Sequence, residues 1–261
     1  MNTILDLDLY PLDRPGTPEY AALVEASKAA LEAEGLFNLP GFLRPGALAQ
    51  TLDHVRPRLA AESYHHARDH NIYFTDHVDG LAADDPALAK VTTQNHTLCH
   101  DQLRETPLDA IYTWQPFMDF LAEVTGTPAL YTMDDPLSGV NVLEYRAGEA
   151  LNWHFDRSVF TTTLLLQSPE TGGDFEYVRD LRSPDNPNHP GIAALLRGEV
   201  ETRLLRQAPG TLNVFLGVNT AHRVTPPLSG PSRIVSVLAH YDRPGVRFSP
   251  TEQMGFYGRT A

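Results

Sequence analysis

The sequence predicts an α+β protein in which N-terminal helices support a β-sandwich or jelly-roll barrel. Apolar residues recur at helical spacing in the first half, whereas short segments rich in Val, Thr, Phe and Tyr follow from about residue 138. Neither an internal repeat nor a long linker divides the chain. We therefore expect a single domain over 1–261, with a mainly helical part at 1–130 and the barrel core at 138–245.

Three stretches of the first half have the pattern of helices. Residues 18–35 place apolar side chains on one helical face and end at a Gly. Residues 43–70 resemble a second helix that starts near a Pro-Gly pair and kinks at Pro57. Residues 101–126 supply a further helical stretch. Together they predict a helical layer beside the barrel.

The second half has the pattern of strands separated by Gly, Pro or Asn turns. The predicted strands are VNVLEY (140–145), FTTTLLLQ (160–167), GDFEYV (173–178), TLNVFLG (211–217), HRVTP (222–226) and RIVSVLAHY (233–241). Between them, residues 181–199 form a polar stretch with three prolines. This stretch predicts a lid that closes over a substrate.

Composition excludes several classes of protein. The formal charge of −13 disfavours a nucleic-acid partner. No apolar run approaches the roughly 18 residues that cross a bilayer, and the acidic N-terminus is unlike a signal peptide. The single cysteine excludes an internal disulfide framework and a thiolate-rich metal site. We expect a cytoplasmic protein without membrane or nucleic-acid partners, in which histidines and carboxylates are the available metal ligands.

The stretch NWHFDRSVF (152–160) contains the strongest candidate metal ligands. Alternate residues of a strand face the same side, so His154 and Asp156 can converge on one ion. His222, which follows a later apolar strand, is the best third ligand. His189 lies in the proline-rich stretch and His240 on the last strand, and both are weaker candidates.

Two histidines and one carboxylate suit a non-heme Fe(II) centre with open coordination positions, although zinc hydrolases use similar sets. Arg233 lies inside an apolar strand eleven positions after His222. A guanidinium beside the metal can bind the distal carboxylate of a small keto-diacid through paired charge-assisted hydrogen bonds. This arginine favours iron with 2-oxoglutarate over zinc.

The ordered set of His154, Asp156, His222 and Arg233, with NVLEYRAGEALNWHFD before it, resembles the Fe(II)/2-oxoglutarate-dependent dioxygenases. The resemblance covers residues 138–245. It implies a double-stranded β-helix, the jelly-roll or cupin-like fold, with Fe(II) as cofactor and 2-oxoglutarate and O2 as co-substrates.

The resemblance also suggests further co-substrate residues. Tyr145, on the preceding strand, corresponds to a tyrosine that contributes a hydroxyl to 2-oxoglutarate in some relatives. Asn141, on the same face of a regular strand, is a further candidate. Many relatives carry Ser or Thr two positions after the arginine, whereas this chain has Val235 there and Ser236 next. The role of that hydroxyl therefore does not carry over.

More narrowly, FTTTLLLQSPETGGDFEYVRDLRS resembles the radical lysine halogenases and their hydroxylating relatives, which act on free amino acids. The halogenases carry Gly or Ala in place of the carboxylate ligand, so that chloride can bind the metal. Because Asp156 occupies that position, the resemblance predicts a hydroxylase, with a lysine-like amino acid as the first substrate to test.

Several residues are candidates for contacts with the substrate. Arg157 follows the ligand pair and is able to bind a carboxylate, whereas Asp135 is able to bind an ammonium group. Other candidates are polar or aromatic residues in apolar surroundings: His96, Tyr73, Gln167 and Trp153.

Two other functions fit parts of the pattern. A zinc-dependent cupin hydrolase or isomerase would use the same ligands but not Arg233. A non-catalytic jelly-roll ligand-binding module would use His154 and Asp156 as hydrogen-bonding residues and bind no metal.

Overall fold

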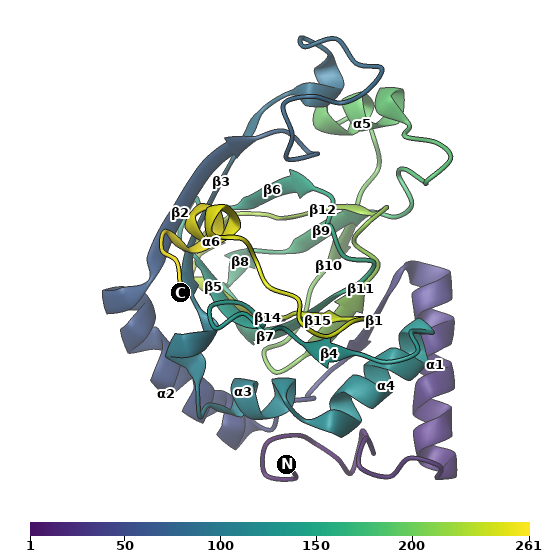
Figure 1. Cartoon of the computed structure of the whole chain (residues 1–261), viewed down its shortest axis with the longest axis vertical. Coiled ribbons are helices and arrows are strands. Elements are labelled where there is room, and N and C mark those ends of the chain that lie inside the picture. The colour runs from purple at the N-terminus through teal and green to yellow at the C-terminus, as the bar shows by residue number, and fades with distance from the viewer.

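The computed structural model describes residues 1–261, and its centre is a barrel of two antiparallel sheets (Figure 1). The larger sheet has seven strands in the order β1 (Leu36–Leu39), β11 (Leu212–Phe215), β7 (Thr161–Gln167), β14 (Arg233–Leu238), β5 (Val140–Tyr145), β3 (Val91–Leu98) and β2 (Tyr64–His70). The smaller sheet has the order β10 (Arg203–Leu205), β9 (Phe175–Val178), β12 (Ala221–Val224) and β6 (Leu151–His154).

Apolar side chains from both sheets meet inside the barrel. Phe175 and Tyr177 of the small sheet pack with Leu36 and Phe215 of the large one. The two sheets therefore face each other as in a jelly roll. Two short ribbons complete the strands: β8 (Thr171–Gly172) with β13 (Pro227–Ser229), and β4 (Tyr131–Thr132) with β15 (His240–Tyr241).

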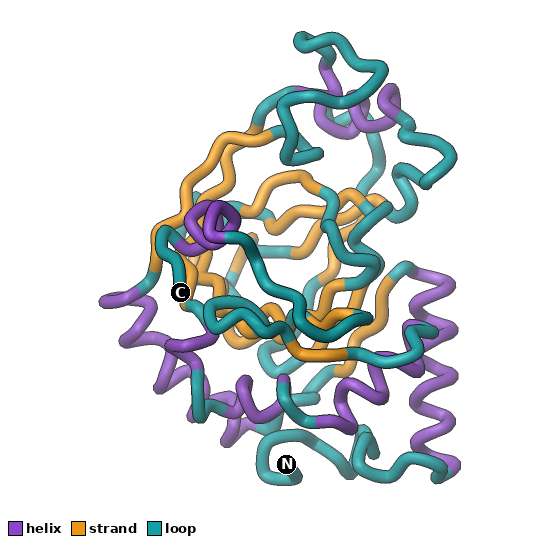
Figure 2. Tube along the Cα trace, viewed as in Figure 1, coloured by secondary structure: helices purple, strands orange, loops and turns teal.

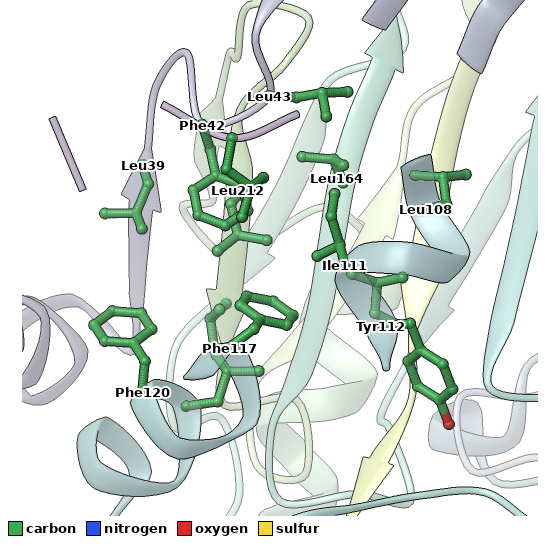
Figure 3. Packing of buried hydrophobic residues seen from close by; sticks show 14 of the residues in the cluster. Leu39, Phe42, Leu43, Leu108, Ile111, Tyr112, Phe117, Phe120, Leu164 and Leu212 are labelled. Atoms are coloured by element: carbon green, nitrogen blue, oxygen red, sulfur yellow. The ribbon is translucent and has the colours of Figure 1, made fainter. Parts of the chain in front are cut away.

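Four helices cover the outer face of the large sheet: α1 (Pro18–Glu34), α2 (Pro45–Glu62), α3 (Pro107–Tyr112) and α4 (Gln115–Thr125). Figure 2 shows these helices gathered on one side of the strands. Alternate residues of the sheet, such as Leu164 and Leu212, pack against Ile111 and Phe117 of the helices (Figure 3). This apolar layer is the main core and anchors the large sheet, which carries Arg233 and Tyr145.

The opposite end of the barrel carries a cap of η1 (Pro86–Leu88) and α5 (His189–Leu196), which lie together at the top of Figure 1. A second apolar cluster joins this cap to the small sheet through Trp153 and Phe155. The remaining elements are η2 (His100–Leu103), which precedes α3, and α6 (Pro250–Tyr257) near the C-terminus. None of the helices combines the length and the apolar character needed to cross a bilayer.

The predicted helix over 18–35, the helical stretch at 101–126 and the strands of the second half are confirmed. The second helix was predicted too long, because α2 ends at Glu62 and residues 64–70 form β2. The mainly helical part also contributes β1 and β3 to the large sheet. These strands were missed because tertiary pairing, rather than their own apolar pattern, determines their conformation.

Candidate metal and co-substrate site

The pairing of β6 with β12 brings two of the predicted ligands together. His154 and His222 are direct partners in this antiparallel register, and their ring centroids are 4.1 Å apart. Side chains of directly opposed residues project to the same face of a sheet, so both imidazoles point into the barrel. The small sheet therefore creates a pair of histidines from positions that are far apart in the sequence.

Asp156, just after the end of β6, completes the triad. Its Oδ1 lies 3.5 Å from Nε2 of His154 and 3.5 Å from Nε2 of His222. The two histidines are only 5% and 3% exposed. One carboxylate oxygen thus faces two buried imidazole nitrogens, an arrangement able to hold a metal ion.

Hydrogen bonds to the backbone fix the tautomer of both rings. Nδ1 of His154 donates to the carbonyl of Asn152 at 2.8 Å, and Nδ1 of His222 donates to the carbonyl of Thr220 at 3.0 Å. Each Nε2 therefore directs a lone pair toward the centre. Burial, together with the neighbouring His222, lowers the pKa of His154, which keeps its ring neutral and able to bind a cation at neutral pH.

Asp156 is held in the charged form and in one orientation. Although burial opposes its ionisation, the imidazoles of His222 and His154 hold its pKa well below the usual value. The hydroxyl of Thr161 donates to Oδ2 at 2.5 Å. Oδ1 is thus left free for a cation, and the donor set fits Fe(II).

Gly217 leaves the space that this carboxylate occupies. A Cβ at position 217 would lie 2.2 Å from Asp156 Oδ2. The backbone carbonyl of Gly217 also accepts a hydrogen bond from the amide of Asp156 at 3.1 Å. A side chain at this position has to displace the carboxylate. The backbone φ of Gly217 is not in the left-handed region, so the local backbone does not itself require glycine.

We therefore expect Gly217→Ala to weaken metal binding by about 10- to 100-fold, the size of effect seen when groups that orient ligands are disturbed. Dialysis against Fe(II) under anaerobic conditions followed by metal analysis measures the change. Gly46→Ala, at a position with open space around it, is the matched control and should bind metal as the wild type does. Unchanged binding by Gly217→Ala would mean that the position of Asp156 does not control affinity.

Arg233, at the start of β14, is a buried cation with few partners. It is 6% exposed, its only hydrogen bond runs from a terminal nitrogen to the carbonyl of Gly173 at 2.9 Å, and its Nε has no partner. No carboxylate lies within ion-pair distance of the guanidinium. Burial lowers its pKa to about 10, so it stays charged at neutral pH. A buried charge without a counter-ion is unfavourable, and an anionic ligand such as the distal carboxylate of 2-oxoglutarate satisfies it.

Tyr145 of β5 lies directly opposite Arg233 in the sheet. Its ring is fully buried, its side chain lines the main cavity, and burial raises the pKa of the hydroxyl, which remains a donor. Asn141 lines the same cavity, but its amide donates to the carbonyl of Leu137 and its oxygen accepts from Tyr257. Ser236 lies on the same strand face as Ile234 and Leu238, away from Arg233. It is therefore not placed to assist 2-oxoglutarate binding as the Ser or Thr of many relatives does.

A cavity of about 350 Å³ opens beside the triad. Its wall is largely apolar, with five phenylalanines: Phe74, Phe155, Phe160, Phe248 and Phe256. Asp156 is the only carboxylate among the lining residues, whereas two arginines, Arg68 and Arg157, line the wall. The cavity therefore suits a small substrate that has an apolar body and a negative charge.

The two arginines of the cavity differ in their surroundings. Arg157 was a predicted substrate contact, and it lines the cavity but is 70% exposed and paired with Glu252 at 2.9 Å. Arg68 of β2 has no hydrogen-bond or ion-pair partner, and its guanidinium lies 5.4 Å from the ring centre of Phe74. The ring of Phe74 in turn packs edge-on against His154. Arg68 is exposed, as Arg157 is, but without a partner it is the freer cation near the metal triad. It is not among the predicted site residues, because residues 64–70 have the pattern of a helix.

The other predicted substrate contacts lie outside this cavity. The carboxylate of Asp135 accepts hydrogen bonds from the amides of Leu137, Ser138 and Phe248, and so holds a turn. His96 faces Glu149 on the outside of the barrel, and Gln167 accepts from Arg56. These three side chains are occupied by contacts with other residues and do not line the cavity.

Two aromatic candidates and the predicted lid belong to the cap. Tyr73 is hydrogen-bonded to His189, and Trp153 is buried beneath the guanidinium of Arg223. In the stretch 181–199, Ile192 is fully buried against the small sheet, and none of these residues lines the cavity. Closure of this stretch over a substrate stays a prediction.

Comparisons with known proteins agree on the fold. The epimerase SnoN, in a crystal structure with Fe3+, alpha ketoglutarate and nogalamycin RO, is 18% identical, with a TM-score of 0.59 over 85% of this chain and 84% of that one. AviO1 from Streptomyces viridochromogenes Tue57 is 16% identical, with a TM-score of 0.55 over 83% and 93%. A Pseudomonas putida prolyl-4-hydroxylase is 14% identical, with a TM-score of 0.51 over 82% and 97%. No curated protein sequence matches the chain.

The jelly roll, the triad of two histidines and one carboxylate, and the buried arginine define an enzyme of the Fe(II)/2-oxoglutarate-dependent oxygenase type. The family described as Halogenase D matches residues 22–245, and the chain belongs to this family. The predicted family and fold are thus confirmed, and the predicted cofactors, Fe(II) and 2-oxoglutarate, are those of this class of enzyme.

Proposed function

We propose that the protein hydroxylates an unactivated C–H bond of a small molecule, and that this molecule is a free amino acid. The observation that carries the proposal is the complete triad, in which Asp156 faces His154 and His222 at 3.5 Å each. When bound, Fe(II) and 2-oxoglutarate supply the oxidising chemistry of this class, in which 2-oxoglutarate and oxygen become succinate and carbon dioxide while the substrate is oxidised.

The residues of the chain have distinct roles in this proposal. His154, Asp156 and His222 hold the metal, and Arg233 binds the distal carboxylate of 2-oxoglutarate. The hydroxyl of Tyr145 donates a hydrogen bond to the same carboxylate from the opposing strand. The phenylalanines of the cavity exclude water from the reacting bond.

Hydroxylation is favoured over halogenation by the intact carboxylate. Chloride needs a coordination position that lacks a protein ligand, and the relatives that use chloride carry Gly or Ala where this chain has Asp156. Thr161 and Gly217 both act to keep that carboxylate in place. The family name alone therefore does not assign a halogenation reaction.

The charge of the cavity favours a substrate with a carboxylate and an uncharged side chain. Arg68 is free to bind the α-carboxylate of an amino acid. A lysine side chain would add a second ammonium group to the α-ammonium group, yet the only lining carboxylate is Asp156, and the nearby Glu252 is already paired with Arg157. We therefore revise the lysine-like first choice to amino acids with apolar or neutral side chains.

The test is a panel of free amino acids incubated with protein, Fe(II), 2-oxoglutarate, chloride and oxygen. The expected result is succinate release together with a product heavier by one oxygen atom, and no chlorinated product. Release of succinate without any modified amino acid would support the oxygenase and reject the substrate class. Absence of succinate with every substrate, and turnover with zinc alone, would favour the cupin hydrolase.

The role of Arg68 has its own control in this panel. Arg68→Gln should raise KM for the preferred amino acid by about 10- to 100-fold, as expected for loss of a charge-assisted contact, and should leave the affinity for 2-oxoglutarate unchanged. Arg203→Gln removes an exposed arginine outside the cavity and should have no effect. Equal KM values for both variants would mean that Arg68 does not bind the substrate.

A further inference from the structure

A second cluster of potential metal ligands lies on the outer side of the β2–β3 ribbon. His65 of β2 and His96 of β3 are direct partners in the antiparallel register, and Glu149 reaches them from the turn between β5 and β6. Residues adjacent to the two histidines in sequence, such as His66 and Asn95, line the cavity on the opposite face of the ribbon. The cluster is therefore separated from the cavity by the thickness of one sheet.

The geometry of this cluster parallels that of the triad. Oε1 of Glu149 lies 3.1 Å from Nε2 of His96 and 3.9 Å from Nε2 of His65. The two rings stack with centroids 4.7 Å apart, so both Nε2 atoms face the same carboxylate oxygen. The other oxygen of Glu149 accepts from the amide of Arg146 at 2.8 Å, which fixes the carboxylate.

Hydrogen-bond donors and acceptors around His96 leave a position for a cation. The hydroxyl of Ser63 donates its single hydrogen to the carbonyl of Leu59 at 2.6 Å. It can only accept from Nδ1 of His96, which lies 3.4 Å away. In the tautomer that has its hydrogen on Nδ1, a neutral His96 turns the lone pair of Nε2 toward Oε1 of Glu149, 3.1 Å away. Two lone pairs at this distance repel each other unless a positive charge lies between them.

A single divalent cation can accept a lone pair from both histidines and from the carboxylate at once. We propose that His65, His96 and Glu149 form a second metal site, independent of the triad, that binds Zn²⁺. Zinc is commonly held by imidazole and carboxylate ligands, and three protein ligands leave a fourth position for water. His65 is 51% exposed, whereas the other two side chains are 13% exposed, so the ion has access from solvent.

The position of the site gives the ion a structural effect. Arg68, Thr93 and Asn95 line the cavity from the same ribbon that carries His65 and His96. A bound ion links this ribbon to the β5–β6 turn, just before the strand that carries His154. Zinc at the second site thus stabilises one wall of the cavity without contacting a substrate.

The test counts zinc in metal-free protein after equilibrium dialysis against Zn²⁺. We expect the wild type to bind one ion at the triad and one at the second site. His65→Gln and His96→Gln should each lose one ion, His222→Ala should lose the other, and the double variant His96→Gln/His222→Ala should bind none. His77→Gln changes a histidine whose side chain is 83% exposed, and this variant should match the wild type.

The outcomes separate the two sites. A wild type that binds a single ion, lost in His222→Ala and kept in His65→Gln, would overturn the second site and leave the proposed function intact. A loss in His65→Gln and His96→Gln but not in His222→Ala would support the second site and contradict the triad. His65 lies at the surface, so His65→Gln is expected to fold. The number of bound zinc ions can then still be interpreted if His96→Gln fails to fold.

Discussion

His222→Ala is expected to lose Fe(II) affinity by more than about 100-fold, because removal of a ligand should exceed the 10- to 100-fold effect of disturbing a group that only orients one. The remaining pair, His154 and Asp156, offers two ligands instead of three. Succinate formation should fall in parallel, since the proposed chemistry requires the metal. Anaerobic dialysis and metal analysis measure affinity, and a succinate assay measures turnover.

A matched control is a buried histidine of the cavity beside the triad. His240 is also buried and lines the cavity, but its Nε2 is hydrogen-bonded to the carbonyl of Tyr112 and not directed at the triad. His240→Gln should retain iron. If His240→Gln loses the metal while His222→Ala keeps it, the metal centre lies elsewhere in the cavity and the proposed triad is wrong.

Arg233→Met is expected to weaken 2-oxoglutarate binding by about 100-fold, which corresponds to about 3 kcal/mol for removal of a buried charged contact. The free protein should not lose stability, because Arg233 is a buried cation without a counter-ion. The same burial that lowers its pKa to about 10 opposes folding at neutral pH, where the guanidinium is charged. Thermal unfolding with and without 2-oxoglutarate measures both effects.

Arg223 is the matched control for this variant. Its Nε is paired with Glu176 at 2.6 Å and its guanidinium covers Trp153, so it is a structural arginine that follows His222 on β12 but does not line the cavity. Arg223→Met should lower the unfolding temperature and leave the stabilisation by 2-oxoglutarate unchanged. An Arg233→Met protein that is still stabilised by 2-oxoglutarate as strongly as the wild type would contradict the proposed role of Arg233.

The barrel could be predicted from sequence because its central strands carry their own signal. Segments such as 160–167 and 233–241 are rich in β-branched residues. In the large sheet, β7 is buried on one face and partly buried on the other, and β14 is buried at every position except Val237. Strand β2 (64–70) is polar at most positions and has one fully buried residue, so no apolar period of two marks it as a strand. Its conformation depends on pairing with β3, which is a contact between distant residues.

The meeting of His154, Asp156 and His222 could also be predicted, since the spacing of His154 and Asp156 is local and the choice of His222 followed from strand order. The substrate contacts could not, because they depend on the direction of individual side chains. Asp135 illustrates this: its neighbours resemble a binding loop in sequence, yet three backbone amides and Gln253 occupy the carboxylate. Arg68 is visible as a site residue only once residues 64–70 are known to alternate between two faces.

The position of β14 in the large sheet affects when the protein can fold during synthesis. This strand lies between β7 and β5, although residues 233–238 follow both of them by more than sixty positions. A growing chain therefore exposes two hydrophobic strands whose shared neighbour has not yet left the ribosome, and contacts of such long sequence separation form slowly. We expect nascent chains that end before β14 to depend on chaperones and to remain sensitive to proteases.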